Sequence, residues 1–523
     1  MTVPADLAAL ARGVIGIGFT GATAPAAPLD ALRTFSPGAL ILFARNAGTN
    51  DELRALVAAL RDIATPSPLI AVDQEGGRVE RIRDAVAALP SAMAVGATGD
   101  VALAERLGTL LGRDLAALGI DVDLAPVADL SLQPRSTVVA TRSYGDDPER
   151  VGQFAIAFAR GLERAGVAAA LKHFPGHGST SEDSHVALPR VTSDAATLRA
   201  RDLVPFARAL AANAASIVLT AHVIVDAFDT ERPATLSPAV LTGLLRHELG
   251  YDGVIATDCL EMDAIAKGVG TVRGAVEALA AGADLLLISH HLDLAHAAAD
   301  AIAAAVHAGE IPFARLLQAH ARVRGLRDRL ARRIPLADAD AVDENAPQEA
   351  ARRAPTVVRG GPRLRAGKPV TVISFEGAVV DNAAVSGRKT SVETPSLSSA
   401  LRQRGWKSEI MRAAIDPAAA DIDLLLEHVA ALGDREFVLV TRDAHLHPAQ
   451  HDAVARILAQ APDSLIVSAR APYDALLWPA ACRIVCIYGD QTISIDGCAD
   501  VLAGRADARG TLPVRLTEDA AVR

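Results

Sequence analysis

The chain has 523 residues, half of them hydrophobic, and a formal net charge of −10. This length exceeds what one hydrophobic core usually supports, so we expect two domains, one of them large. Basic residues do not gather into a tract beyond ordinary helix faces such as residues 322–333. The acidic balance therefore argues against nucleic acid as a partner.

Two features of the sequence bear on location and on metals. Uninterrupted apolar runs of about twenty residues are missing, and residues 1–10 lack a basic region ahead of an apolar run. We therefore expect a soluble cytoplasmic protein with no membrane partner. Four cysteines are few for a disulfide scaffold and form no metal-type pair, and no HExxH frame accompanies the clustered histidines. We expect no metal and no cofactor. The residues concerned are Cys259, Cys482, Cys486 and Cys498, with His290, His291, His296, His445, His447 and His451.

Strand-like and helix-like segments alternate through the first three fifths of the chain. Amphipathic stretches at 51–63, 101–118, 148–165, 195–211 and 238–249 predict helices between the strands. Such alternation predicts a parallel sheet, and eight units predict an N-terminal (β/α)8 barrel, the TIM barrel. The eight apolar segments are 14–19, 39–43, 69–72, 120–125, 167–171, 216–220, 253–256 and 284–288.

A change in composition after residue 330 separates the barrel from a second region. We predict a catalytic barrel at 1–333, a linker at 334–368 and a C-terminal domain at 369–523. This second region carries no obvious reactive motif. Its α/β pattern predicts a smaller layered α/β sandwich, with apolar runs at 370–375, 437–441, 465–468 and 484–488 and helical stretches such as 448–460.

The most informative stretch is residues 172–185, which follow the fifth predicted strand. Lys172 and His173 are expected where that strand ends, and a turn rich in glycine and proline comes next. Asp183 then stands two residues before His185. A carboxylate so placed can hold an imidazole in one tautomer and raise its pKa, so we interpret the two residues as a proton-donating dyad. Loop histidines are more often solvated or structural, but packing alone explains such a loop poorly.

Charged residues follow several of the predicted strands. They occur at 73–81 after the third strand, at 141–145 after the loop behind the fourth, and at Lys172 and His173. The sixth and seventh strands lead into residues 220–222 and 257–262. Because a barrel assembles its active site at the C-terminal ends of its strands, these groups should face one opening.

Four motifs, in order along the chain, resemble those of the family 3 glycoside hydrolases. They are residues 73–81, 142–145, 172–185 and 236–258. Within that family the chain resembles β-N-acetylglucosaminidases of the NagZ type in their two-domain form, over most of residues 10–330. The resemblance implies a retaining enzyme that removes terminal non-reducing β-GlcNAc, with muropeptides from peptidoglycan as substrate and cell-wall recycling as its role.

The resemblance also implies roles for individual residues. Asp258 would be the nucleophile, with Asp183 and His185 as the acid/base pair. The chain departs from the family pattern at two places near the site. Cys259 stands where many relatives have a second acidic or small residue, and residues 133–140 differ from the sequence that is commonest in the family. The residues implied to bind the sugar are Asp73, Arg81, Arg142, Lys172 and His173.

The implied mechanism replaces one of the two carboxylates of most retaining glycosidases by a histidine. Asp258 would attack the anomeric carbon while His185 protonates the leaving oxygen, and neutral His185 would then deprotonate water. Asp183 would orient the imidazole. Neither a metal nor a cofactor takes part.

Several alternatives stay open at this point. A neutral histidine base repels a phosphate acceptor less than a carboxylate would, so phosphorolysis could replace hydrolysis. A β-glucosidase of the same family is another candidate, although the Asp-x-His loop favours the N-acetylated sugar. Candidates of a different class are a non-catalytic sugar-binding protein and a metal-dependent barrel hydrolase. The sequence does not give the aglycone or the oligomeric state.

Overall fold

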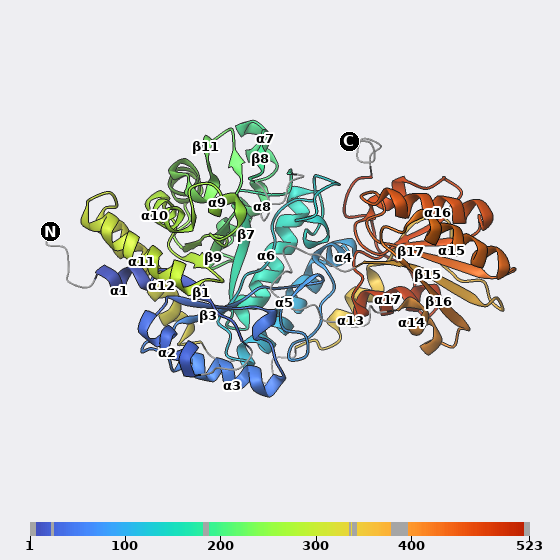
Figure 1. Ribbon diagram of the computed structural model, residues 1–523, viewed down its shortest axis with the longest axis horizontal. Coiled ribbons are helices and arrows are strands. Elements are labelled where there is room, and N and C mark those ends of the chain that lie inside the picture. The colour runs from blue at the N-terminus through green and yellow to red at the C-terminus, as the bar shows by residue number, and fades with distance from the viewer. Residues whose placement is uncertain are drawn as a thin grey trace.

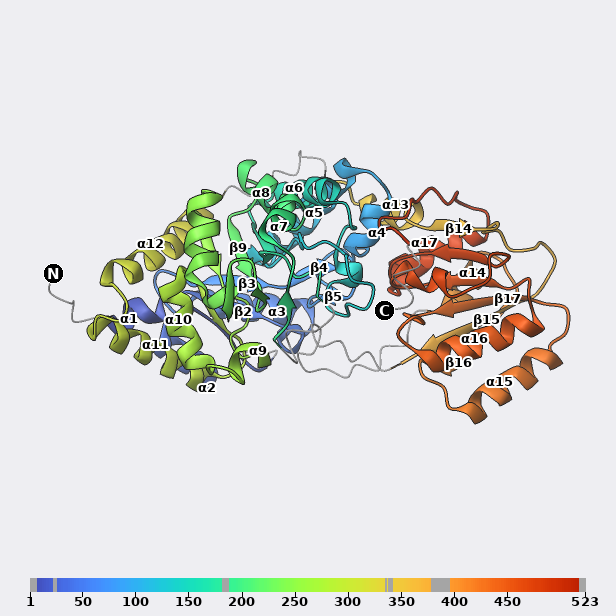
Figure 2. The ribbon, with the colours of Figure 1, turned by 90° about the horizontal axis from the view of Figure 1, so that it is seen from above.

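A computed structural model of the protein describes residues 7–21, 26–180, 188–333, 336, 342–377 and 396–516. The chain forms two α/β parts that lie side by side, the N-terminal part in blue to yellow and the C-terminal part in orange and red (Figures 1 and 2). Helices α4 (Ala92–Ala97) and α13 (Ala346–Arg353) lie where the two parts meet.

The N-terminal part is the predicted barrel. Eight parallel strands pair in chain order, and a parallel bridge between Ala256 and Leu285 joins the last two. Each predicted apolar segment overlaps one strand, so the prediction of a (β/α)8 barrel is confirmed. The strands are β1 (Ile15–Gly18), β2 (Ala39–Leu42), β3 (Leu69–Val72), β6 (Val122–Asp123), β7 (Ala168–Phe174), β9 (Ile217–Thr220), β12 (Val254–Ala256) and β13 (Leu286–Ile288).

Two strands differ in length from their apolar segments. β6 has two residues, because Pro126 follows closely and has no N–H to donate to a ladder. β7 runs on to Phe174, so Lys172 and His173 lie within the strand rather than after it. Because Lys172 and His173 are polar, a prediction based only on runs of apolar residues ended this strand too early.

The barrel's helices match the predicted stretches with one exception. The stretch 195–211 forms two helices, because Pro205 cannot donate a hydrogen bond back into the preceding turn. The segment Ala239–Glu248 is a wide helix in which the amide of Leu249 bonds the carbonyl of Leu244. Among the described helices, none is long and apolar enough to cross a bilayer. The main helices are α3 (Asn50–Arg61), α5 (Val101–Ala117), α6 (Pro148–Arg164), α7 (Ala195–Ala200), α8 (Val204–Ala211), α10 (Thr271–Ala281), α11 (Leu292–His307) and α12 (Phe313–Leu330).

Small and branched apolar side chains fill the barrel interior. Alternate residues of each strand point inward, as Ile41 does, while its neighbours Leu40 and Leu42 pack outward with the helices. Helix α12 adds Val323 and Leu326 to the interior cluster. A packed interior leaves the C-terminal rim of the barrel as the place for a binding site.

The C-terminal part is a three-layer α/β sandwich, as predicted. Its sheet has the order β14-β19-β18-β17-β15-β16, with β14 antiparallel to β19 and the other pairs parallel. Both faces are covered, which explains why its strands read as continuous apolar runs. The elements are β14 (Thr356–Arg359), β15 (Val370–Glu376), α14 (Leu397–Gln403), β16 (Ser408–Ala414), α15 (Ala419–Ala431), β17 (Glu436–Thr441), α16 (Pro448–Gln460), β18 (Leu465–Ser468), β19 (Arg483–Cys486) and α17 (Thr492–Leu502).

Packing joins the two parts closely. The range 334–368, predicted as a linker, contains α13 and β14, and α13 packs against both α5 of the barrel and α17 of the sandwich. From the barrel, Met93 and Ala97 of α4 belong to the apolar core of the sandwich. Ser91 also donates a hydrogen bond of 2.6 Å to the carbonyl of Tyr488. The sandwich therefore shares apolar surface with the barrel.

Candidate active site

A chain of alternating charges lies at the C-terminal rim of the barrel. Asp73 follows β3 directly, and its two oxygens bind the ammonium of Lys172 at 2.5 Å and the guanidinium of Arg81 at 3.1 Å. Lys172 also forms an ion pair with Glu75, two residues beyond Asp73. Strands β3 and β7 thus hold one ammonium between two carboxylates.

Arg142 extends this chain from the loop behind β6. Its Nε and Nη2 donate to the two carboxylate oxygens of Glu75 at 2.8 and 2.7 Å, a bidentate pair. Its Nη1 donates to the carbonyl of Val138 at 3.0 Å, and Nη2 lies 3.4 Å from Nε2 of His173. Arg142 is therefore fixed on three sides and has one defined orientation.

His173 is fixed by a buried carboxylate behind it. Asp129 Oδ2 lies 2.6 Å from His173 Nδ1, and Asp129 Oδ1 accepts the amide of His177 at 2.7 Å. The ring of His177 is also buried, with Thr180 Oγ1 at 2.7 Å from its Nδ1. Burial lowers the pKa of His177 to about 4, so this ring is neutral at pH 7 and unsuited to donate a proton there.

Charge pairing decides the protonation of the carboxylates. Burial by itself would raise the pKa of Asp73, but the charges of Lys172 and Arg81 outweigh it and lower that pKa well below its usual range. Arg142 and Lys172 likewise lower the pKa of Glu75 against the effect of burial. Lys172 itself keeps a raised pKa, because Asp73 and Glu75 overcome its desolvation. The network is ionised throughout, so it offers fixed acceptors and donors.

Asp123, at the end of β6, behaves in the opposite way. Its Oδ1 accepts the amide of Gln74 at 3.0 Å, while its buried Oδ2 has no hydrogen-bond partner among the described residues. Burial raises the pKa of Asp123 well above its usual value, and the nearby charges of Asp73 and Glu75 add to the effect. The protonated form of Asp123 is therefore favoured, in contrast to the ionised carboxylates of the network beside it.

Asp258 lies at the end of β12, one residue after Thr257. Its Oδ1 accepts the amide of Cys259 at 2.7 Å, a bond that favours the ionised carboxylate. The carbonyl of Cys259 is also fixed by a contact. His222, which follows β9, places its Nε2 2.9 Å from this oxygen and its Nδ1 2.8 Å from Thr235 Oγ1. Neighbouring strand ends thus fix the turn that carries Asp258.

The predicted dyad, Asp183 and His185, lies outside the described residues. The segment before it is fixed at Gly178, where a side chain would collide with the loop behind β6: an added Cβ would lie 1.7 Å from the carbonyl oxygen of Leu130. The amide of Leu132 also donates to the carbonyl of Gly178 at 3.2 Å. The start of this loop therefore needs glycine.

The C-terminal sandwich contacts the rim loop at residues 129–146, which carries Arg142. Near one end of the loop, Tyr473 OH lies 3.4 Å from Ser131 Oγ, and His445 Nε2 lies 3.0 Å from the carbonyl oxygen of Pro134. At the other end, Asp146 Oδ2 accepts Nε of Arg515 at 3.0 Å. A residue assigned to sugar binding thus stands on a loop that the second domain holds at both ends.

The structure connects all five predicted sugar-binding residues in one network. It also brings to the site four residues to which the sequence analysis assigned no role. Glu75 lies inside the motif at residues 73–81, so a second carboxylate close to Asp73 could have been predicted from the sequence. Asp129 lies six residues after Asp123 on a stretch that reads as apolar, and only the fold brings it behind His173. The added residues are Glu75, Asp123, Asp129 and His222.

Comparison with known proteins agrees with this geometry. The model of the glycosyl hydrolase family 3 N terminal domain matches residues 28–326. The β-hexosaminidase of Chromobacterium violaceum is 40% identical over 301 residues, which cover 56% of this chain and 83% of that protein. The β-hexosaminidase A of Pseudoalteromonas piscicida is 38% identical over 287 residues, 51% of this chain and 48% of that protein, so the match spans about half of that relative.

A solved structure extends the likeness to the sandwich. The family 3 β-N-acetylglucosaminidase of Paenibacillus sp. str. FPU-7 superposes with a TM-score of 0.90 at 34% identity and covers 99% of both chains. Barrel, rim and matches together define a glycoside hydrolase. Because the family model spans more than half of the chain, the protein belongs to glycosyl hydrolase family 3. The resemblance drawn from the sequence motifs is confirmed.

Proposed function

We propose that the protein is a retaining exo-β-N-acetylglucosaminidase that removes terminal non-reducing β-GlcNAc from muropeptides in the cytoplasm. The observation that carries the proposal is the ionised network from Asp73 to Arg142 at the rim that also bears Asp258. Fixed carboxylates accept, and fixed cations donate, the hydrogen bonds by which sugar hydroxyls are recognised. The names of the related β-hexosaminidases support the N-acetylated sugar.

In the first step, the Asp258 carboxylate attacks the anomeric carbon as the bond to the leaving oxygen breaks. The amide of Cys259 stabilises this carboxylate, and the contact between His222 and Cys259 keeps the turn rigid. His185, with Asp183 as its partner in the proposed dyad, gives a proton to the leaving oxygen, so the aglycone departs neutral. The product of this step is a covalent glycosyl-enzyme.

In the second step, neutral His185 takes a proton from water, which attacks the anomeric carbon and displaces Asp258. Two displacements at one carbon retain the configuration of the sugar. The network at Lys172 and Arg142 is already paired before substrate arrives, so it needs little reorganisation during either step. His177 does not compete for the acid role, because its pKa of about 4 keeps it neutral.

Turnover of chromogenic glycosides tests the proposal directly. We expect rapid release of p-nitrophenol from p-nitrophenyl β-GlcNAc and much slower release from p-nitrophenyl β-glucoside. The anomer of the sugar product that forms first should be β by NMR. Faster turnover of the glucoside would contradict the assigned specificity, and an α product would contradict retention. Binding of GlcNAc without any turnover would indicate a sugar-binding protein instead.

The same assay in phosphate buffer separates hydrolysis from phosphorolysis. A histidine base would tolerate an anionic acceptor, which is why phosphorolysis deserves its own measurement. We expect free GlcNAc in both phosphate and non-phosphate buffers. If GlcNAc 1-phosphate accumulates, and does so only in phosphate buffer, phosphate rather than water is the acceptor in the second step. Competition between a muropeptide and a chitin disaccharide then tests the proposed aglycone.

A further inference from the structure

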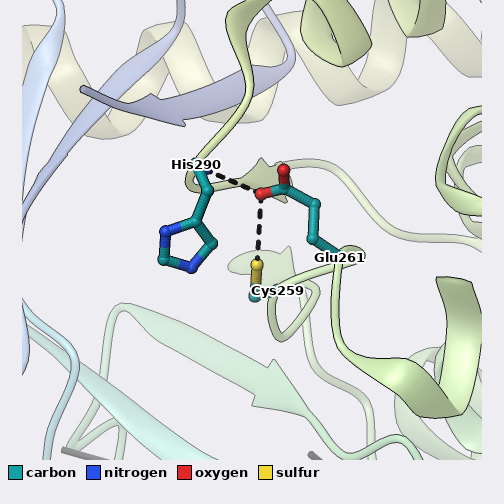
Figure 3. Close-up of side chains that lie close together, drawn as sticks. All are labelled: Cys259, Glu261 and His290. Carbon is teal, nitrogen blue, oxygen red and sulfur yellow. Dashed lines mark hydrogen bonds between the residues drawn. The ribbon is translucent and has the colours of Figure 1, made fainter. Parts of the chain in front are cut away.

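Beside Asp258, three side chains of metal-ligating type converge on one point. Cys259 and Glu261 come from the loop after β12, and His290 comes from the loop after β13 (Figure 3). The thiol of Cys259 lies 3.6 Å from Oε2 of Glu261, and one ligand atom from each residue lies within 4.8 Å of the others. The catalytic steps above use none of these three side chains.

The Glu261 carboxylate is already fixed in the position that a ligand needs. It accepts the amides of His290 at 2.7 Å and His291 at 3.0 Å, and Oε1 lies 2.6 Å from Nδ1 of His291. Its side chain is largely buried, whereas His290 is exposed, so a cation could enter from solvent on the histidine side. Such outer contacts orient metal ligands in proteins.

We propose that Cys259, Glu261 and His290 form a binding site for a soft divalent cation such as Zn²⁺. A tetrahedral zinc site with one sulfur and one oxygen ligand places those two atoms about 3.5 Å apart, close to the separation observed here. A fourth position would be left to water, as in sites with three protein ligands. The proposal departs from the sequence-based expectation that the protein binds no metal, which rested on the absence of familiar spacing motifs.

A cation at this site takes the place of the proton on the Cys259 thiol, because the thiolate rather than the thiol is the metal ligand. On binding, the S–H bond breaks, its electron pair goes to the metal and its proton to solvent. We therefore expect binding to release a proton.

Other charges around the cluster set its strength. Arg45 Nη1 lies 3.1 Å from Nδ1 of His290 and opposes a cation, while Asp258 and Glu261 favour one. Occupancy by Zn²⁺ would balance the two negative ligands, Cys259 thiolate and Glu261. Because Arg45 must tolerate the added charge, we expect reversible binding that follows the free metal concentration, as a regulatory site requires.

An effect on catalysis follows if the proposed function holds. The metal would sit on the residue whose amide bonds the Asp258 carboxylate, so its charge would stabilise that carboxylate and lower its nucleophilicity. The site would then act as an inhibitory switch. Binding itself does not depend on the identity of the substrate.

Direct binding measurements test the site without reference to activity. The metal-free full-length chain would be titrated with Zn²⁺ by calorimetry and with Cd²⁺ by the ultraviolet absorption of a thiolate–metal bond. We expect one equivalent to bind, with proton release, and about tenfold or more weaker binding in Cys259→Ser and in His290→Ala. His307→Ala, an exposed histidine at the end of α11, serves as the matched control.

Each outcome decides the proposal. Unchanged affinity in Cys259→Ser, no thiolate absorption with Cd²⁺, or equal loss in His307→Ala would overturn the site. For the switch, saturating Zn²⁺ should lower kcat/KM about tenfold or more, and a chelator should restore it, whereas Cys259→Ser should resist inhibition. Stoichiometric binding with unchanged kcat/KM would refute the switch alone. A metal-free enzyme without glycosidase activity would refute the proposed function, while the binding data would still judge the site.

Discussion

Both sheets of this protein carry charged side chains at the C-terminal ends of their strands, yet the two ends differ in what they leave open. In the barrel, the Asp73 side chain keeps 20% of its surface exposed within the ion network. In the sandwich, Arg442 follows β17 and its side chain is only 2% exposed. The same topological position thus holds a partly exposed carboxylate in one domain and an enclosed guanidinium in the other.

Arg442 shows how the second network closes. Its Nη1 donates to Ser374 Oγ at 3.0 Å and to the carbonyl of Phe375 at 2.6 Å, and its Nε donates to Asp490. Arg470 then bonds Asp490 at 3.0 Å. An open α/β sheet usually binds ligands between the strands where its order reverses, here β15 and β17. Arg442 fills that place itself.

The comparison teaches that charged strand ends do not by themselves mark an active site. What distinguishes the barrel rim is that the Asp73 carboxylate stays partly open to solvent and that Asp258, on the same rim, is also partly exposed. The sandwich network lies against the barrel instead: burial raises the pKa of Asp490, but the charges of Arg470, of Arg442 and of Arg78 from the barrel outweigh it and lower that pKa well below its usual range. We expect the first network to govern turnover and the second to govern stability.

The largest effect on turnover should come from Asp258→Ala. Without the nucleophile the covalent route is lost, and kcat should fall by about 10⁴–10⁶-fold, the scale seen when a catalytic nucleophile is removed. Circular dichroism and the melting temperature should stay close to the parent, and a slow fluorinated sugar should label the peptide that contains Asp258. Label on another peptide would show that the nucleophile lies elsewhere on the rim.

His185→Ala should lower hydrolysis of a GlcNAc disaccharide by about 10²–10⁴-fold, the usual contribution of a general acid. A dinitrophenyl glycoside needs no acid for its leaving group, so its first step should be largely spared. Water would still lack its base, which predicts a burst of dinitrophenol followed by slow steady release. Asp183→Ala should show a milder form of this pattern. Equal loss in the first step with both substrates would mean that His185 only binds sugar.

A matched pair of arginine substitutions tests the comparison itself. Arg142→Lys breaks a bidentate contact with Glu75 that lysine cannot reproduce, and kcat/KM of the folded enzyme should fall about 10–100-fold. Arg442→Lys should instead lower the free energy of unfolding by about 3–5 kcal/mol while the folded enzyme keeps its kcat/KM. If the two variants exchange these signatures, the sandwich network is the functional one.

Asp123→Asn should change how stability depends on pH. The folded-state pKa of Asp123 is raised, so the native state binds a proton that the unfolded chain gives up near pH 4. The parent should therefore lose up to about 1.4 kcal/mol of stability per pH unit above that point, until the folded pKa is reached. The variant lacks this slope, so the difference in melting temperature between variant and parent should shift in the variant's favour as pH rises above about 4, until the folded pKa of Asp123 is reached. Parallel pH profiles would show that Asp123 is ionised in the native state.

The smallest effect is expected from His445→Gln at the domain junction. Burial lowers the pKa of His445, but the hydrogen bond and charge of Asp474 outweigh it and raise the value above normal. The stabilisation is thus complete below the unfolded pKa near 6.5 and disappears as pH rises through the folded value. The variant should lose about 0.5–1.5 kcal/mol at pH 5.5 and less at pH 9. His428→Gln, an exposed control, should lose little at either pH.

The sequence predicted the barrel well because each strand is a short apolar run followed by turn residues. The extent of β7 was less visible, since Lys172 and His173 are polar although they lie within the strand, at the irregularity in its pairing with β9. Glu75 was within reach as an acidic neighbour of Asp73, whereas Asp129 could not be linked to His173 without the fold, because the two residues lie 44 positions apart. The burial of Arg442 was hidden too, since it depends on residues of three separate strands and the loops that follow them.

The attachment of the loop at 129–146 to the sandwich has a consequence for how the enzyme would fail on heating. Contacts at Ser131, Pro134 and Asp146 hold the loop from the far side of the domain junction. If the two domains part before either one unfolds, Arg142 loses its support while the barrel remains intact. Thermal inactivation would then precede the loss of secondary structure, and cooling would restore activity as long as the parted surfaces did not aggregate.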